Sequence, residues 1–142
     1  MTIAAILQNK GSEVLTVDCA TSVREAVTLL AERKIGALPV LRAGQVAGIM
    51  SERDIIYCLQ SDGAAVLDWT VEKIMTAPAI TVSPGTEILG ALSLMTRRRI
   101  RHLPVVDGEA LIGLVSIGDL VKFRMDKIEA EAEAMLNYIQ SV

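Results

Sequence analysis

Residues 36–54, GALPVLRAGQVAGIMSERD, and residues 101–119, RHLPVVDGEALIGLVSIGD, are two versions of one pattern placed 65 positions apart. The match continues without a gap over residues 16–56 and 81–121, where 13 of 41 paired positions are identical. A long repeat that occurs only twice indicates a module with two-fold pseudosymmetry, because a solenoid needs three or more units. A site formed by one copy is therefore expected to have a counterpart in the other.

Each copy predicts the order strand, helix, strand, strand, helix, and thus a mixed α/β fold. In the first copy, strands are expected over 14–17, 37–41 and 46–50, and a helix over 23–34. The helix has apolar residues at i, i+3, i+4 and i+7, which give it one buried face. In the second copy, Asp107-Gly108 between apolar runs at 103–106 and 110–115 predicts a hairpin. The last helix of each copy is expected to begin at Ser51 or Ser116.

A shorter repeated segment, called the echo segment below, precedes each copy. Residues 2–7, TIAAIL, resemble residues 70–75, TVEKIM, although the spacing to the following strand differs by three residues. Both stretches are interpreted as short helices that lead into the repeats, and residues 61–68 as a connector. The chain is thereby divided into residues 1–68, the first repeat with its leading helix and connector, and residues 69–142, the second repeat with its leading helix and an extended C-terminal helix.

The last helix, expected from 117 to 140, continues past the end of the repeat. Apolar residues recur along it at alternating spacings of four and three: Val121, Met125, Ile128, Ala132, Met135 and Ile139. Such a stripe can fold back on its own domain, or it can pack against a second copy of the chain as a heptad-like seam. Because the helix outlasts its repeat, we favour self-association and expect a homodimer.

Composition excludes several classes of function. Among the 142 residues, 51% are apolar but only 3% are aromatic, and the net charge is −3, which disfavours nucleic acid as the main partner. Cys19 and Cys58 stand far apart, as reduced thiols of a cytoplasmic protein would. With His102 as the sole histidine, no metal site or catalytic triad is expected. No apolar run approaches the ~18 residues of a membrane span, so no membrane partner is expected.

The most informative local motif is Gly, two apolar residues, Ser, two residues, Asp, at residues 48–54 and 113–119. Ser-x-x-Asp at a helix start places a hydroxyl and a carboxylate beside free backbone N–H groups, where an anion is favoured. An ionised carboxylate accepts hydrogen bonds and suits the neighbouring hydroxyls of a ribose. Phosphate and diol together indicate a ribonucleotide. The alternative is a purely structural capping box.

The two copies differ where a ligand would sense the difference. Gly36-Ala37 of the first copy corresponds to Arg101-His102 of the second, and Arg53 corresponds to Gly118. Arg53, Arg101 and His102 are candidates for phosphate contacts, since an arginine can bind phosphate through two hydrogen bonds. His102 can equally be a structural strand residue. The basic run 97–99 either complements the helix dipole or attracts an anion towards the second cleft.

These landmarks resemble the CBS domain, the nucleotide-sensing module named after cystathionine β-synthase. The resemblance covers nearly the whole chain: Thr-Val at 16–17 and 81–82, IGALPV at 35–40 and IRHLPV at 100–105, and both Ser-x-x-Asp motifs. Two CBS domains in tandem form a Bateman module, and this chain is similar to the stand-alone bacterial type. The resemblance implies two pseudosymmetric β-α-β-β-α repeats packed sheet to sheet, with two equivalent clefts between them.

The resemblance also implies the ligand and its contacts. CBS pairs bind adenosine derivatives, so AMP, ADP, ATP, NAD or S-adenosylmethionine is expected, with Asp54 and Asp119 on the ribose and Ser51 and Ser116 on the phosphate or the helix start. The first cleft is expected to comprise Thr16, Gly36, Ala37, Leu38, Pro39, Ser51, Arg53 and Asp54. The second cleft is expected to comprise Thr81, Arg101, His102, Leu103, Pro104, Ser116 and Asp119.

The favoured hypothesis is a non-catalytic sensor that binds an adenine nucleotide and changes its contact with an unidentified regulated protein. The alternative is a structural or protein-interaction dimer with vestigial clefts, which the retention of both serines and both aspartates disfavours. A small enzyme is the weakest hypothesis, because Asp54 and Asp119 lie in separate repeats and neither cysteine has an activating partner. We expect no catalytic residue and no catalytic cofactor.

Overall fold

The computed structural model describes residues 1–11 and 13–141. The first half contains α1 (Ile3–Lys10), β1 (Val17–Asp18), α2 (Val23–Arg33), β2 (Ala37–Arg42), β3 (Gln45–Ser51) and α3 (Glu52–Asp62). The second half contains the 3₁₀ helix η1 (Gly63–Asp68), α4 (Val71–Ile74), α5 (Ile88–Arg98), β4 (His102–Asp107), β5 (Ala110–Ser116) and α6 (Ile117–Gln140). The mixed α/β fold with two small sheets and an extended C-terminal helix is confirmed, and the expected connector is helical.

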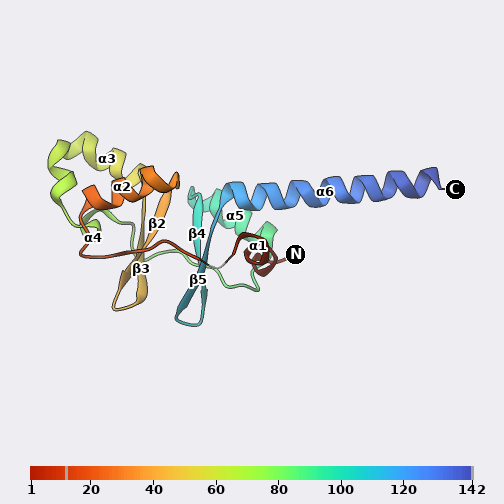
Figure 1. The fold of residues 1–142 in the computed structure, drawn as a ribbon, viewed down its shortest axis with the longest axis horizontal. Coiled ribbons are helices and arrows are strands. Elements are labelled where there is room, and N and C mark those ends of the chain that lie inside the picture. Colours follow the sequence, from red (N-terminus) through yellow and green to blue (C-terminus); the bar gives the residue numbers. More distant parts are fainter. Residues whose placement is uncertain (12, 142) are drawn as a thin grey trace.

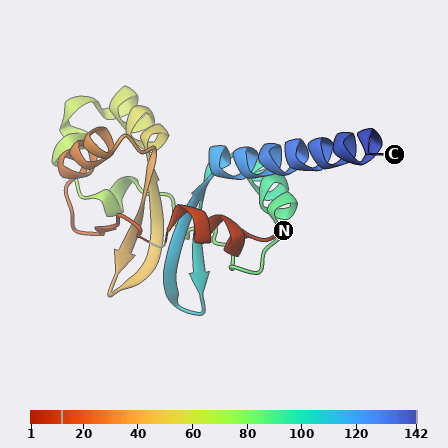
Figure 2. The same cartoon turned by 45° about the vertical axis from the view of Figure 1, so that its right-hand side comes forward.

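The two hairpins are built alike. The strands β2 and β3 pair antiparallel with Val40 opposite Gly48, and β4 and β5 pair with Val105 opposite Gly113. Each ladder has one irregularity at the same place, between Val40 and Leu41 and between Val105 and Val106. The hairpins lie next to each other in the middle of the molecule, with α2 and α3 on one side and α5 and α6 on the other (Figures 1 and 2).

The first strand of each repeat departs from expectation. The structure places β1 at Val17–Asp18, parallel to β2, rather than over 14–17. In the second repeat only an isolated bridge between Val82 and Val105 remains. The reason is chemical: the Cys19 N–H donates to the Leu41 carbonyl at 2.9 Å, whereas the residue corresponding to Cys19 is a proline without an N–H. The second sheet therefore has two strands where the first has three.

Each repeat has its own apolar core, and the leading helices are exchanged between the cores. Ile3 and Ile6 of α1 are buried in the core of the second repeat, and Val71 and Ile74 of α4 are buried in the core of the first. Both cores are built mainly from aliphatic residues, in agreement with the scarcity of aromatic ones. The division at residue 68 follows the sequence repeats. Each apolar core, in contrast, contains residues from both sides of this division.

Backbone hydrogen bonds fix this exchange. Ile3 N–H donates to the Thr86 carbonyl at 2.9 Å, and Val71 N–H donates to the Thr21 carbonyl at 2.8 Å, which is the corresponding bond in the other half. The isolated bridges between Thr2 and Glu87 and between Ser22 and Thr70 repeat the same relation. Each leading segment thus forms backbone hydrogen bonds with the residues just before the first helix of the opposite repeat.

The conserved spacing of the glycine motif also follows from the exchange. A Cβ atom added to Gly48 would lie 2.7 Å from the Thr76 carbonyl oxygen and 2.8 Å from the Met75 sulfur. A Cβ atom added to Gly113 would lie 2.5 Å from Leu7 Cδ2. Leu7 and Met75 are the last residues of the two echo segments, so the glycines provide the space in which the exchanged segments pack against β3 and β5.

The helix α6 extends far beyond the rest of the molecule (Figure 1). Its apolar stripe is not covered by its own domain: Val121, Met125, Ile128, Met135 and Ile139 are 41–61% exposed. Among the described residues, no helix combines the length and the apolar composition needed to cross a membrane.

Gly48→Ala is expected to lower the free energy of unfolding by about 1–3 kcal/mol, because the added methyl group meets the Thr76 backbone and overpacks the contact. Gly90→Ala is the control: it lies in α5 with nothing within 4 Å of the added atom and should gain about 0.5–1 kcal/mol. Urea unfolding of both variants checks this. A Gly48→Ala protein as stable as the unmodified chain would show that the exchanged segment does not pack against β3.

Candidate functional site

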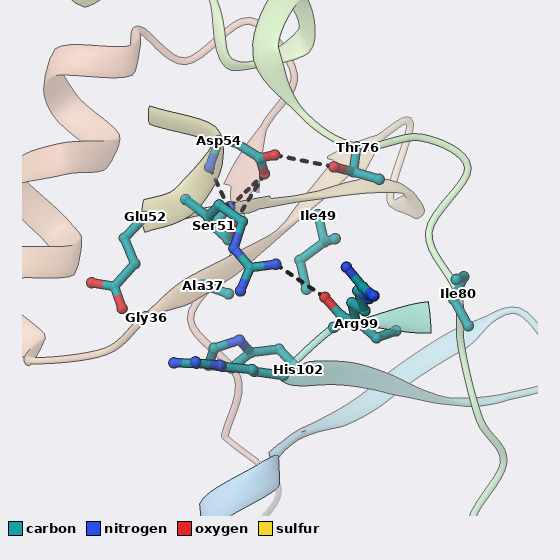
Figure 3. Close-up of a pocket in the computed structure, with 13 residues that line it drawn as sticks. Gly36, Ala37, Ile49, Ser51, Glu52, Asp54, Thr76, Ile80, Arg99 and His102 are labelled. Carbon is teal, nitrogen blue, oxygen red and sulfur yellow. Dashed lines mark hydrogen bonds between the residues drawn. The ribbon is translucent and has the colours of Figure 1, made fainter. Parts of the chain in front are cut away.

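A cavity of about 180 Å³ lies at the junction of the two repeats. Its lining comes from the turn into β2, from the end of β3 and the start of α3, from the segment after α4, and from the loop between α5 and β4 (Figure 3). The residues that line it are Gly36, Ala37, Ile49, Ser51, Glu52, Arg53, Asp54, Thr76, Ile80, Arg99, Ile100, Arg101 and His102. Both repeats therefore contribute to one pocket, which we call the Asp54 pocket.

Asp54 is held at the start of α3 by a capping box. Its Oδ2 accepts hydrogen bonds from the Ser51 N–H at 2.9 Å and the Ser51 hydroxyl at 3.1 Å, and the Asp54 N–H donates to Ser51 Oγ at 3.3 Å. Its other oxygen, Oδ1, accepts from the Thr76 hydroxyl at 3.2 Å (Figure 3). A carboxylate oxygen has two lone pairs, so Oδ1 keeps capacity for a further donor. The cap thus positions the carboxylate at the pocket wall.

The His102 ring, from the second repeat, lies against Gly36 of the first repeat. A Cβ atom added to Gly36 would lie 3.1 Å from His102 Cε1 and 3.2 Å from both His102 Nε2 and Glu52 Oε1. The absence of a side chain at Gly36 therefore makes room for the imidazole (Figure 3). Burial lowers the pKa of His102 below its usual value and outweighs the opposing effect of the Glu52 carboxylate, with Lys10 also favouring the neutral ring.

Three arginines from both repeats give the pocket an excess of positive charge. Arg53 comes from α3, and Arg99 and Arg101 come from the loop before β4. The Arg53 guanidinium donates to the Arg99 carbonyl oxygen at 3.1 Å and so links the two repeats across the pocket (Figure 3). Glu52 and Asp54 are the acidic residues that line it. An anionic ligand would find guanidinium groups on two sides.

The region around Asp119 has the same capping box but a different neighbour. Asp119 Oδ2 accepts from the Ser116 N–H at 2.8 Å, and the Asp119 N–H donates to Ser116 Oγ at 3.1 Å. The Lys10 ammonium lies 2.6 Å from Asp119 Oδ2. Burial opposes ionisation of Asp119, but the hydrogen bonds from Lys10 and from the Ser116 backbone outweigh it and lower the pKa of the carboxyl.

The structure groups the sequence-predicted residues differently from expectation. Arg101 and His102, expected in the second cleft, also line the Asp54 pocket. His102 still lies beside the second motif, since it pairs with Ser116 across β4 and β5 and the Asp119 carboxylate acts on its pKa. From the predicted first cleft, the pocket gathers five residues: Gly36, Ala37, Ser51, Arg53 and Asp54.

Other predicted residues lie outside this pocket. Leu38 and Leu103 are fully buried in the two cores, since neighbouring residues of a strand point to opposite faces. The strand prolines next to them, Pro39 and Pro104, are buried as well. Thr16 is half-buried and Thr81 exposed, and neither is among the described residues that line the pocket.

Sequence reasoning missed several pocket residues. Arg99 was visible in the basic run 97–99, but only its position at the end of α5, with φ of 54°, brings it to the pocket. Thr76 reaches Asp54 because its backbone pairs with Ile49, with N–O distances of 2.9 and 3.0 Å in the two directions. No local sequence signal marks such a long-range pairing.

The sole histidine provides a direct check on the pocket environment. In the folded protein, His102 is expected to titrate below 6.5, because burial disfavours its charged form. The folded state is then stabilised above the unfolded pKa, and this contribution is lost as the pH falls towards the folded pKa. The single imidazole resonance followed by NMR against pH, with the urea-unfolded chain as control, measures the shift. A midpoint at or above that of the unfolded chain would contradict the burial of the ring.

Comparison with known proteins agrees with the fold. A model of the CBS domain family matches the chain twice, at residues 10–61 and 71–126. The chain is 36% identical over 148 residues to the mitochondrial CBS domain-containing protein CBSX3 of Arabidopsis thaliana, covering 98% of this chain and 72% of that protein. It superposes on a CBS-domain containing protein from Agrobacterium tumefaciens with a TM-score of 0.84 and 37% identity, covering 87% of this chain and 99% of the other.

Two similar structures contain ligands. The CBS domain pair of protein MJ0100 is in complex with 5′-methylthioadenosine and S-adenosyl-L-methionine; it is 26% identical, has a TM-score of 0.79, and the match covers 89% of this chain and 98% of that one. CBSX2 is in complex with AMP; it is 28% identical, has a TM-score of 0.73, and the match covers 88% of this chain and 96% of that one. The two family matches, the pseudosymmetric hairpins and the stand-alone relatives lead to one conclusion: the chain belongs to the CBS domain family and is a tandem pair of CBS domains.

Proposed function

We propose that this protein is a non-catalytic regulatory module that binds a phosphate-bearing adenine nucleotide in the Asp54 pocket. The observation that carries the proposal is the pocket itself, in which a capped carboxylate and three arginines from both repeats surround one cavity. The ligands of the related MJ0100 and CBSX2 structures are adenosine derivatives, which supports an adenosine ligand here.

The chemistry of the lining supports a division of roles. Asp54 Oδ1 has capacity to accept a hydrogen bond from a ribose hydroxyl, and Ile49, Ile80 and Ile100 offer apolar surface for an adenine ring. Arg53, Arg99 and Arg101 suit a phosphate, since guanidinium groups bind phosphate through paired hydrogen bonds.

The charge of the pocket favours AMP, ADP or ATP over S-adenosylmethionine. S-adenosylmethionine carries a sulfonium cation, which three guanidinium groups would repel, whereas each added phosphate increases the attraction. NAD, which carries two phosphates, is compatible with the same lining.

A ligand between the repeats can act as a signal. Because the pocket is lined from both halves, a bound nucleotide contacts both and stabilises the relative arrangement that fits it best. Regulation requires that the regulated protein distinguishes this arrangement from the ligand-free one. The alternative, an interaction module with vestigial clefts, would need no open pocket with a capped carboxylate.

We further propose that the protein acts as a homodimer through α6. Its exposed apolar stripe has the spacing of a coiled-coil seam. The half of the helix nearer the body carries Lys122, Arg124 and Lys127 together with Asp119 and Asp126, an excess of one positive charge, and the outer half carries Glu129, Glu131 and Glu133. Antiparallel pairing of two copies brings these opposite charges together, whereas parallel pairing opposes like charges. We therefore propose that α6 of a second copy, running antiparallel, covers the apolar stripe.

Nucleotide binding is tested by thermal unfolding with AMP, ADP, ATP, NAD, S-adenosylmethionine and GTP. At 100 times its dissociation constant a ligand stabilises by about 2.7 kcal/mol, which corresponds to roughly 5–10 °C for a chain of this size. Adenine nucleotides are expected to give this shift, and S-adenosylmethionine and GTP little or none. Asp54→Ala should remove most of the shift. Asp119→Ala, which loses the equivalent cap, is the matched control and should keep it. If none of these ligands raises the unfolding temperature of the folded protein, the interaction module would be favoured.

The dimer is tested by single-cysteine crosslinking in a background lacking Cys19 and Cys58. Ile128→Cys lies near the middle of the stripe and Ile139→Cys near its end. Antiparallel pairing brings the two copies of position 128 together and separates those of position 139, so only Ile128→Cys should crosslink. Crosslinking of both variants would indicate parallel pairing, and a monomer in sedimentation would refute the dimer.

A further inference from the structure

The two Ser-x-x-Asp motifs are chemically identical, yet their carboxylates have different neighbours. Asp54 Oδ1 accepts a hydrogen bond from a neutral hydroxyl, that of Thr76. Asp119 Oδ2 accepts one from a cation, the Lys10 ammonium, at 2.6 Å. Thr76 follows α4, and Lys10 is the last residue of α1, so the difference arises outside the repeated pattern.

The leading helices end differently. α4 stops at Ile74, and the chain then runs extended, so that the Thr76 N–H donates to the Ile49 carbonyl at 2.9 Å. α1 continues as a helix to Lys10. The Lys10 ammonium donates at 2.9 Å to the carbonyl of Leu114, the residue that corresponds to Ile49. A side-chain cation in one half therefore satisfies the carbonyl that a backbone N–H satisfies in the other.

The presence of Lys10 at this position affects what Asp119 can bind. Oδ2 already accepts from the Ser116 N–H and from Lys10. The ion pair is only partly exposed, with 42% of the Lys10 side chain and 28% of the Asp119 side chain accessible, so solvent competes with it less than at an open surface. A ribose that approached Asp119 would have to displace the ammonium or share the carboxylate with it. At Asp54 a ribose meets only a hydroxyl, which can rotate away.

We propose that Lys10 makes the two clefts unequal, so that one chain binds one adenine nucleotide tightly, at Asp54, and a second at Asp119 at least tenfold more weakly. The inference rests on the proposed function, because it concerns the ligand of that function. Lys10 is thereby the residue that determines stoichiometry. The retained Ser116 and Asp119 keep the cap of α6, while the Lys10 ammonium occupies Oδ2, one of the two carboxylate oxygens that Asp119 could offer to a ribose.

Calorimetric titration with AMP and with ATP tests the stoichiometry. The unmodified chain should bind one nucleotide per chain tightly, and Lys10→Met should tighten the second site at least tenfold. Lys73→Met, which removes an exposed lysine from α4, the other leading helix, outside the lining of the Asp54 pocket, is the matched control and should behave as the unmodified chain. Two equal sites in the unmodified chain, or a second site that Lys10→Met leaves unchanged or weakens, would overturn the proposal. Absence of any binding in all three proteins would instead overturn the proposed function.

A second measurement examines the ion pair without nucleotide. Lys10 on α1 and His102 on β4 are the charged or titratable groups that act on Asp119 from neighbouring elements. Lys10 lowers the folded pKa of Asp119, so its stabilisation is present above the unfolded pKa and is lost as the pH falls through the folded one. Lys10→Met should therefore be less stable than the unmodified chain at pH 7, and the difference should shrink in acid. A difference that does not change with pH would show that Lys10 leaves Asp119 free, which overturns the proposal.

Discussion

Backbone hydrogen bonds between each leading segment and the opposite repeat hold the two halves of this protein in a single arrangement. Ile3 bonds to Thr86, and Val71 bonds to Thr21, so neither repeat completes its core from its own neighbouring segment. Glycine at position 48 leaves room for the backbone of the incoming segment at Thr76, and glycine at position 113 leaves room for the Leu7 side chain. The arrangement of the two repeats, and therefore the shape of the pocket between them, depends on these few contacts.

The same exchange explains why a nearly symmetric fold has asymmetric clefts. The leading segments run along β3 and β5 and end beside the two capped aspartates. Because α4 stops at Ile74 whereas α1 continues to Lys10, Thr76 lies at one aspartate and Lys10 at the other. The loop before β4 adds Arg99, Arg101 and His102 to the Asp54 pocket. Pseudosymmetry of the backbone therefore coexists with a marked difference in charge and hydrogen bonding at the two sites.

Much of this organisation could be predicted from the sequence, because the 65-residue repeat, the capping motif and the helical stripes are local patterns. The expected α6 helix is present, and both Ser-x-x-Asp motifs form the capping boxes that were the alternative interpretation of their spacing. The exchange of the leading helices could not be predicted, since the echo at 2–7 and 70–75 shows two similar helices without showing which core each one joins. Arg101 and His102 are predicted with Asp119 because they belong to the same repeat; that they also line the pocket at Asp54 depends on how the two repeats pack, which no local pattern shows. Leu38 was assigned to a cleft beside Ala37, but adjacent strand residues point to opposite sides.

A crystal structure of the protein grown with AMP tests the central claim most directly, which is that the junction of the repeats is a nucleotide site built around Asp54. The expected result is AMP in the Asp54 pocket, with its ribose hydroxyls within hydrogen-bond distance of the Asp54 carboxylate and its phosphate among Arg53, Arg99 and Arg101. A nucleotide seated at Asp119 with the Asp54 pocket empty, or no nucleotide in either place at saturating concentration, would contradict the claim.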